Sequence, residues 1–456
     1  MTPLIATVVF AIGILVLFVL DRDLKARTSS ALWLPVAWLA LGASRTIPQW
    51  LQVSPVGVME STDGDALERL VLTGLLVAGL MVLLARRRRA KTFLQANGPL
   101  LVFFFYCAVS ILWSDDPVGA IKRWFRTVGS LVMVLVVLTD PDPSAAVKRL
   151  LARSAFLLIP LSVLLIKYYP HLGRSYSVAA GTQHNIGVAF TKNSLGIICL
   201  IFGLGSLWRF LGAFYNGDRS RTTGPLIAHG VVLAMVLWLF WMANSATSLV
   251  CFLIGGVLIA LTSWRGSAPR PTTVHTVALL TQFLCVLGFA LSFDESLTAM
   301  LGRDPSLTGR TVIWARLLSM TVNPWFGTGF ESFWLGERDK LAGEGYSFHL
   351  NQSHNGYIEI FLNLGLVGLV LLSFVIVWGY RNLVGALHRD PELGWELGWL
   401  RLVYFVIVVV YNVTEAAFKL THPLWIIFLL AVIVIPEAPR DAARGAASRG
   451  PGHGIF

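Results

Sequence analysis

The sequence predicts an all-α, polytopic integral membrane protein with about 12 to 13 transmembrane helices, and three observations support this fold class. Hydrophobic residues make up 55% of the 456 residues and charged residues only 13%, whereas soluble domains carry about 25% charged residues. The apolar residues form stretches of roughly 15 to 22, enough to cross a ~30 Å hydrocarbon core as helix. Segments such as 75–85 are apolar on every side, which excludes the alternating strands of a membrane barrel.

Thirteen apolar segments are the predicted spans. The short second segment is followed by Pro48, and only a few residues around Glu415 separate the last two segments, so both places are candidates for re-entrant elements. The first segment lacks a basic flank and a cleavage site before Asp21, which indicates a retained span rather than a signal peptide. The segments are residues 3–20, 31–44, 68–85, 98–113, 128–139, 153–169, 194–213, 225–243, 248–264, 275–292, 357–379, 399–414 and 422–435.

The net charge of +11 would suggest a nucleic-acid partner in a soluble protein, but its distribution indicates membrane orientation instead. The densest basic cluster, 86–91, lies between the third and fourth spans, and the positive-inside rule places it in the cytoplasm. Alternating the spans from there gives the cytoplasmic side 22 basic and 10 acidic residues, against 14 and 15 on the other side. The basic excess therefore sets topology, and no nucleic-acid partner is predicted.

The same scheme divides the chain into four regions. Residues 1–291 hold the N-terminal transmembrane helices, 292–357 a large periplasmic loop, and 358–436 the C-terminal transmembrane helices. Residues 437–456, rich in Ala, Gly, Arg and Pro, are expected to form a disordered cytoplasmic tail. An external excursion of this length is usually functional.

Cofactor chemistry has little support in the sequence. No GxxxxGK[ST] loop, dinucleotide fingerprint or kinase motif is present, so chemistry driven directly by ATP is not expected. The four cysteines lie in apolar stretches without a CxxC pair, which argues against a zinc site or a disulfide framework. We therefore expect neither a cofactor nor a metal.

Cationic side chains in three external loops are the first candidates for function. Held at a membrane surface, they suit the diphosphate of a lipid carrier whose chain stays in the bilayer. The alternative is that they are interfacial anchors and snorkelling side chains. Function is favoured for Arg310 and for Lys192 with its neighbour Asn193, and anchoring for the others. Those others, kept as candidate substrate-binding residues, are Arg123, Arg126 and Arg174.

The long loop has predicted internal structure. Residues 310–322 can form a helix with Ile313, Leu317 and Met320 on one stripe, ended by the Asn-Pro pair at 323–324. Such a helix would lie at the membrane interface, with Trp314 at headgroup depth. The following stretch, 323–330, contains glycines that permit conformations closed to other residues.

His354 is the candidate general base. It lies just before the span at 357–379, and a histidine with an unperturbed pKa near 6.5 can accept the proton that an attacking sugar hydroxyl must lose. The alternative is a hydrogen-bonded structural histidine at the interface. His184 and His349 lack comparable polar neighbours and are expected to be structural.

An ordered series of motifs resembles those of the O-antigen ligase and polymerase superfamily, including exopolysaccharide polymerases. The series covers roughly residues 113–368, and no single motif is specific alone. It consists of Trp113-Ser-Asp-Asp-Pro117, Lys192-Asn-Ser-Leu-Gly196, Thr308-Gly-Arg310 with Trp314, Asn323-Pro-Trp-Phe-Gly-Thr-Gly329, and Ser353-His-Asn-Gly-Tyr357 with Gly365 and Gly368.

This resemblance implies a GT-C-like helical fold and transfer of a glycan from an undecaprenyl diphosphate carrier to a hydroxyl without nucleotide or metal. By position, His354 matches a family histidine that is proposed to activate or position the acceptor hydroxyl. Arg310 matches a family arginine that is thought to bind the diphosphate. Asn355 and Trp314 fall in the same motifs and are further candidate substrate-binding residues. Lys192 stands where ligases usually have arginine, a departure that favours a polymerase.

The resulting hypothesis is an inner-membrane glycosyltransferase with its active site facing the periplasm, acting on undecaprenyl-diphosphate-linked oligosaccharide. A ligase that uses a lipid A core as acceptor is the alternative in the same class. A transporter or flippase would show mid-membrane charges or inverted repeats, which the sequence lacks. A scaffold working with other polysaccharide assembly proteins has no feature for or against it.

Overall fold

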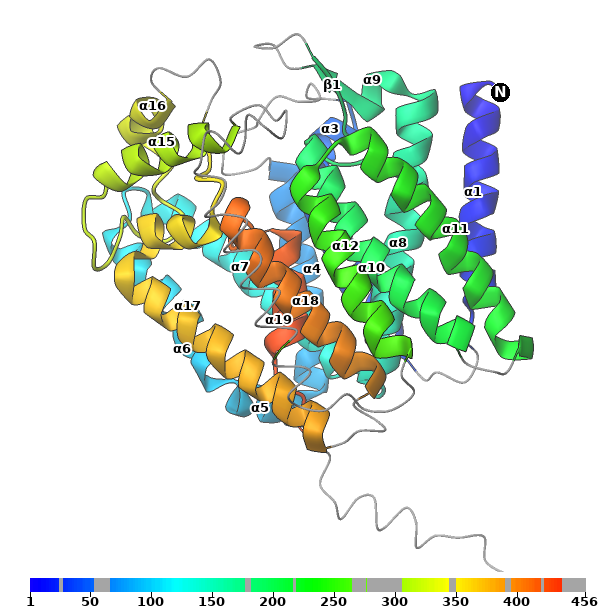
Figure 1. The fold of residues 1–456 in the computed structure, drawn as a ribbon. Helices are drawn as coiled ribbons and strands as arrows, with labels where there is room; N and C mark the ends of the chain where they lie inside the picture. The colour runs from blue at the N-terminus through cyan, green and yellow to red at the C-terminus, as the bar shows by residue number, and fades with distance from the viewer. Residues whose placement is uncertain are drawn as a thin grey trace, which may run out of the picture.

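The computed structural model describes residues 1–23, 28–52, 66–176, 182–215, 219–264, 276, 306–343, 350–389, 395–419 and 422–436. Within these ranges nearly all regular structure is helical, which confirms the predicted all-α class (Figure 1). The predicted span at 275–292, apart from residue 276, lies outside the described residues, as do His349 and the tail beyond 436.

Eight described helices are long and apolar enough to cross a membrane, and a ninth span is counted if a bent pair is taken as one. In the bent pair, α5 (Arg87–Ala96) and α6 (Gly98–Val109) meet at 88°. The eight helices are α1 (Pro3–Leu20), α4 (Ala66–Ala85), α8 (Pro143–Tyr168), α10 (Lys192–Tyr215), α11 (Arg219–Ala243), α12 (Ala246–Trp264), α17 (Gly356–Arg389) and α18 (Trp395–Thr414).

Three predicted spans fall on helices that do not reach this standard, so the count of about 12 to 13 exceeds what length and composition support in the described part of the chain. Helices α2 (Trp33–Ala43) and α19 (Pro423–Val432) have only 11 and 10 residues, too few to cross a ~30 Å core. Helix α7 (Pro117–Leu138) begins eleven residues earlier than the segment predicted at 128–139, and its first turns carry charged side chains. Its apolar stretch is correspondingly short.

Polar caps followed by proline fix where several helices begin. The side chains of Asp116 and Asp142 accept hydrogen bonds from the backbone N–H groups of Gly119 and Ala145, at 3.0 and 2.9 Å. Each cap precedes a proline at the first helical position, where the missing N–H costs nothing. Helix α19 begins in the same way after His422. These signals set the start of α7 at 117.

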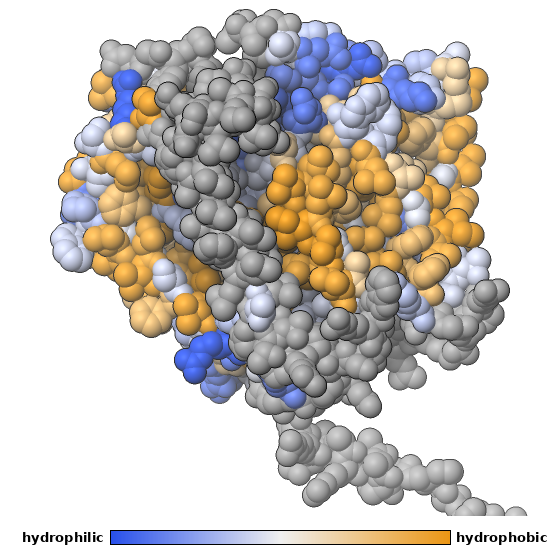
Figure 2. Space-filling model, in the orientation of Figure 1, coloured by the Kyte–Doolittle hydropathy of each residue, from blue (hydrophilic) through white to orange (hydrophobic). Residues whose placement is uncertain are grey.

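The helices form two groups with α18 between them, packed against both α12 and α17 (Figure 1). Helices α1, α8, α10, α11 and α12 make one group, and α5, α6, α7, α17 and α19 lie in the other. Among the described residues on the face drawn in Figure 2, apolar side chains gather at mid-height, and hydrophilic ones lie above and below them. That distribution is expected of a protein surrounded by lipid.

The short elements gather mainly at one end of the bundle, opposite to α5 with its run of arginines (Figure 1). There, β1 (Arg174–Tyr176) and β2 (Gln183–Asn185) pair as an antiparallel hairpin. The basic cluster and the polar loops are therefore at opposite ends, as the predicted orientation requires. The remaining short elements are η1 (Ser30–Leu32), α3 (Ile47–Trp50), η2 (Ser110–Trp113), α9 (Pro170–Gly173), α15 (Ser306–Ser319) and α16 (Gly336–Gly343).

The turn predicted at 323–330 fills a break in α17. Gly327 and Gly329 have φ of +67° and +95°, which confirms the expected special conformations. Helix α17 is interrupted at Gly365, where φ is +65° and a Cβ would lie 2.3 Å from a backbone atom of the turn. The backbone N–H of Leu366 instead donates to the carbonyl oxygen of Pro324 at 2.9 Å. The turn thus satisfies backbone groups that the break releases.

Candidate active site

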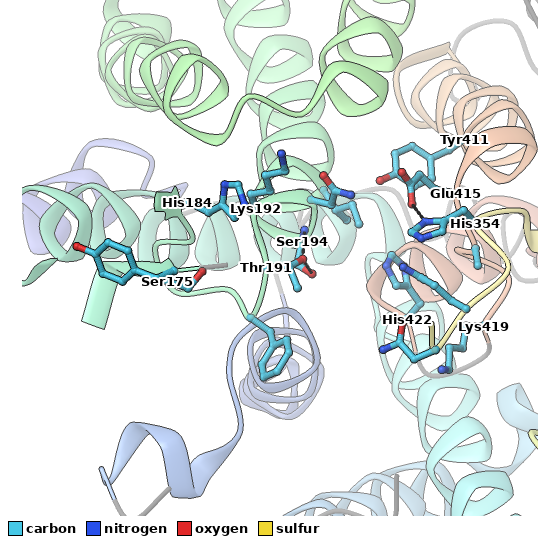
Figure 3. Close-up of a pocket in the computed structure, with 17 residues that line it drawn as sticks. Ser175, His184, Thr191, Lys192, Ser194, His354, Tyr411, Glu415, Lys419 and His422 are labelled. Carbon is cyan, nitrogen blue, oxygen red and sulfur yellow. Dashed lines mark hydrogen bonds and ion pairs between the residues drawn. The ribbon is translucent and has the colours of Figure 1, made fainter. Parts of the chain in front are cut away.

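A cavity of about 590 Å³ lies at the loop end of the bundle, lined by 17 residues (Figure 3). One wall comes from the β1–β2 hairpin and the start of α10, and the other from the loops before α17 and after α18. Three of the predicted site residues, Lys192, Asn193 and His354, line this one cavity. The fold therefore brings together a cation and a histidine that are far apart in the sequence.

His354 is held in an uncommon backbone conformation beside a buried acid. Its φ is +51°, in the left-handed region where histidine is several-fold enriched over most residues. Its Nδ1 lies 3.3 Å from Oε2 of Glu415, the first residue after α18, which is 7% exposed. The other carboxylate oxygen, Oε1, accepts a hydrogen bond from Arg310 at 3.1 Å. Glu415 thus bridges the two predicted catalytic residues.

The electrostatics of this triad favour a charged carboxylate at Glu415. Burial raises the pKa of Glu415, but the hydrogen bond from His354 and the charge of Arg310 outweigh it, so this pKa lies below its ordinary value. A carboxylate facing Nδ1 favours the tautomer with the proton on that nitrogen. The lone pair is then on Nε2, where it can accept a proton from a substrate.

Arg310 lies behind Glu415 rather than among the residues that line the cavity. Besides its contact with Glu415, it donates to the backbone carbonyl of Thr414. Both contacts fix the loop that follows α18 to the helix α15. A role of Arg310 in binding diphosphate stays a prediction from the resemblance.

The loop that carries His354 is anchored on both sides of that residue. The N–H of Ser353 donates to Glu359 Oε2 at 3.0 Å, and its carbonyl accepts the indole N–H of Trp314 at 2.6 Å. On the other side, Nδ2 of Asn355 donates to the carbonyl of Val413 at 3.0 Å. The histidine is therefore held in place by buried groups of three helices, α15, α17 and α18.

Trp314 and Asn355, two predicted substrate-binding residues, make structural contacts in this loop. Trp314 is only 8% exposed and packs with Ile313 and Leu317 in the core of the loop, where its indole N–H has a hydrogen-bond partner. Asn355 caps α17 by accepting from the N–H of Tyr357 at 2.9 Å. Neither residue lines the cavity. Their contacts hold the loop of His354 in place.

Gly356 permits the close approach of α17 and α18 on which the site depends. A Cβ at this position would lie 1.9 Å from Oδ1 of Asn412. That oxygen accepts the N–H of Ala417 at 2.9 Å and so folds the loop after α18 back on the helix end. The His-Asn-Gly sequence therefore combines the predicted base, a helix cap and the space that Asn412 occupies.

The opposite wall is built from the start of α10 and the hairpin. Oγ1 of Thr191 accepts the N–H of Ser194 at 3.1 Å, as expected of a residue that starts a helix, and Lys192 follows it. His184, expected to be structural, also lines the cavity. Burial and the charge of Lys192 lower the pKa of His184. This histidine is thus neutral at physiological pH.

The other three predicted arginines bind structural partners. Arg123 is 7% exposed and lies in α7 with Arg126, while Arg174 begins β1. None of the three lines the cavity. The structure thus agrees with the structural alternative for them. Their partners are Asp116 at 3.4 Å, Glu68 at 3.3 Å and the carbonyl of Ile166 at 3.2 Å.

The predicted Trp113–Pro117 motif docks the long loop on the helices. The indole N–H of Trp113 donates to the carbonyl of Phe326 at 3.3 Å, and the hydroxyls of Ser114 and Ser332 are 2.5 Å apart. Asp115 forms an ion pair with Arg338. This motif therefore holds the loop in place and supplies no residue to the cavity.

Four residues that sequence reasoning missed complete the wall that carries His354: Tyr411, Glu415, Lys419 and His422. The available signal was the short polar interruption between the last two apolar segments. Glu415 is a lone acid there, at the place where a re-entrant element is the candidate. Its distance of 61 positions from His354 hid the pairing.

Comparison with known proteins agrees with this architecture. Residues 204–373, which include Arg310 and His354, match a family model described as O-Antigen ligase. The chain is 26% identical over 309 residues to the exopolysaccharide production protein ExoQ of Rhizobium meliloti (strain 1021), covering 64% of this chain and 67% of ExoQ. The resemblance to the O-antigen ligase and polymerase superfamily is confirmed.

Two further relatives carry a different name. The chain is 21% identical over 356 residues to a protein of Rickettsia conorii named "Putative polysaccharide ligase RC0486", covering 76% of this chain and 82% of that protein. A similarly named protein of Rickettsia felis is 21% identical over 378 residues, covering 80% and 86%. Together with the apolar helices, these matches identify a multi-pass membrane enzyme of the O-antigen ligase or exopolysaccharide polymerase type.

Proposed function

We propose that this protein is a glycosyltransferase that moves glycan repeat units from an undecaprenyl diphosphate carrier to a hydroxyl acceptor at the periplasmic face of the inner membrane. The observation that carries the proposal is the buried Glu415 holding His354 at a cavity whose opposite wall presents Lys192. A base on one side and a cation on the other are what such a displacement requires.

In the proposed reaction, Nε2 of His354 accepts the proton of the acceptor hydroxyl as its oxygen attacks the anomeric carbon of the donor. A new carbon–oxygen bond forms, the bond to the diphosphate breaks, and the diphosphate leaves with the electron pair. The charge of Lys192 stabilises the leaving group, and the carboxylate of Glu415 stabilises the imidazolium. The proton then leaves His354 for solvent or the diphosphate, which restores the base.

For Arg310 the geometry supports positioning of Glu415, since its guanidinium contacts that carboxylate and the Thr414 carbonyl. Direct binding of diphosphate remains the prediction from the resemblance. The variant Arg310→Lys separates the two roles, because a lysine keeps the charge but not the planar fork. If the variant no longer positions Glu415, kcat should fall. If it no longer binds the diphosphate, the KM for the donor should rise.

The periplasmic orientation is supported by the positions of the cavity and of the basic helix α5 at opposite ends of the bundle (Figure 1). It can be tested with single cysteines in a cysteine-free background. Glu337→Cys on α16 should react with an impermeant thiol reagent from the periplasm, and Arg88→Cys on α5 should not; both positions are exposed. The reverse labelling pattern would place the cavity in the cytoplasm.

The decisive experiment for the proposed function uses purified protein and a lipid-diphosphate-linked repeat unit without nucleotide. Longer glycans on the carrier are the expected product of a polymerase, which the similarity to ExoQ supports. Transfer only when a lipid A core is added would identify a ligase, the alternative that the names of the Rickettsia relatives favour. The absence of any transfer would point to a transporter and refute the proposal.

A further inference from the structure

The cavity contains a second cation that the proposed reaction does not use. Lys419, in the loop after α18, lines the same cavity as Lys192. Figure 3 shows the two lysines on opposite sides of the view, with Lys419 beside His422 and near His354. The two charges therefore belong to different ends of one cavity rather than to a single cluster.

The charges of the lining residues do not cancel. Glu415 is the single acid among them. Its two oxygens are already engaged, one by His354 at 3.3 Å and the other by Arg310 at 3.1 Å. The cavity is thus positive, and its two lysines can attract more than one anionic group.

His422 adds a neutral donor next to Lys419. Its Nδ1 accepts the backbone N–H of Leu424 at 3.2 Å, which places the ring proton on Nε2. The backbone N–H of His422 also donates to the carbonyl of Lys419 at 2.9 Å, so a tight turn joins the two residues. A lysine ammonium and an imidazole N–H brought together in this way can both donate to one phosphate.

We propose that Lys419 and His422 form a second anion subsite, which binds the diphosphate of an acceptor that is itself linked to a lipid carrier. This inference rests on the proposed function, in which Lys192 binds the diphosphate of the donor. The subsite lies on the wall of His354, where the acceptor hydroxyl must be deprotonated. A lipid-linked acceptor also stays at the membrane surface, at the same end of the bundle as the cavity.

The test compares acceptors that differ only in their anionic group. Full-length protein in lipid vesicles is given one lipid-diphosphate donor and either a lipid-diphosphate acceptor or the same glycan on an uncharged lipid. Lys419→Met should raise the KM for the diphosphate acceptor about tenfold, as expected for one lost charge-assisted hydrogen bond. The KM for the uncharged acceptor and for the donor should stay unchanged.

Three further variants serve as controls. Lys419→Arg should retain the low KM because it keeps the charge. His422→Asn removes the Nε2–H but keeps a good helix cap for α19, so it should raise the same KM with unchanged protein stability. Lys340→Met changes an exposed lysine of α16 that does not line the cavity, and it should have no effect.

Several outcomes would overturn the inference. The second subsite would be refuted if Lys419→Met changed the KM for both acceptors equally. It would also be refuted if this variant changed the KM for the donor, or changed no KM at all. An acceptor with a carboxylate sugar on an uncharged lipid provides a further comparison. If Lys419→Met raised the KM for this acceptor by the same factor, the subsite would bind the glycan and not the diphosphate. If the unaltered protein transfers to no acceptor, the proposed function itself fails, and this result is distinguishable from the others.

Discussion

The two walls of the cavity differ in how firmly their side chains are held. On the His354 wall, hydrogen bonds from α15, α17 and α18 converge on a few residues, and the acid partner is 7% exposed. On the Lys192 wall, the hairpin strands have three residues each and Tyr176 is 70% exposed. Proton transfer requires fixed distances, whereas a charge attracts an anion over a range of positions. We therefore propose that proton transfer takes place at the His354 wall and that the donor diphosphate binds at the Lys192 wall.

The largest expected effect is that of His354→Ala. Loss of a general base should lower kcat about 10²- to 10⁴-fold, with little change in the amount of folded protein. His171→Ala is a matched control, since His171 is exposed at the same end of the bundle and does not line the cavity. The measurement is the rate of glycan transfer from the lipid diphosphate donor by purified protein.

Near-normal transfer by the His354 variant would assign this histidine a structural role. The proposed assignment of chemistry to this wall would then be wrong. If the His354 variant fails to accumulate, Ser353→Ala serves as a second variant. It leaves the imidazole in place and changes only the loop that carries it. Loss of folded protein in both would indicate that the loop, not the base, is essential.

The next effect tests whether Glu415 acts through His354. Glu415→Gln keeps the size of the side chain but removes the charge that selects the tautomer, and we expect kcat to fall about 100-fold. The KM for the donor should change little, because Lys192 is untouched. Glu337→Gln on α16 is the control, since Glu337 is exposed and remote from the cavity. An unchanged kcat would show that His354 needs no acid partner.

The contrast between the walls also explains what the sequence could predict. His354 and the Lys192–Asn193 pair were predicted because each lies in a local motif beside a predicted span. Glu415 was not, because its approach depends on packing between α17 and α18, which Gly356 and Asn412 permit. Local patterns identify residues, whereas contacts over long sequence distances come only from the fold.

The same limit applies to the helices. Long apolar runs predicted α1, α4 and α10 closely, since burial in lipid depends on composition alone. They missed the start of α7, which is set by the cap of Asp116 within a charged stretch. The apolar stripe of α15 was predicted, but the sequence could not tell that Trp314 would find the carbonyl of Ser353. A stripe indicates that one face is buried, not what covers it.

A smaller effect is expected on the less firmly held wall. Lys192→Met should raise the KM for the lipid diphosphate donor about tenfold, the value of one charge-assisted contact. The decrease in kcat should be smaller than with Glu415→Gln, since the base is intact. Lys91→Met on α5, at the opposite end of the bundle, is the control. A loss of kcat alone, with the donor KM unchanged, would move Lys192 from binding to chemistry.

The smallest expected effect is that of removing divalent metal. Among the residues that the structure describes, no group of three or more His, Cys, Asp or Glu side chains could hold a metal ion. The lysines of the cavity can stabilise a diphosphate without one, so transfer should proceed at the same rate with EDTA present. Complete loss of transfer, with recovery on adding magnesium or manganese, would contradict this. It would also mean that a metal ion bound to the substrate diphosphate takes part in the transfer.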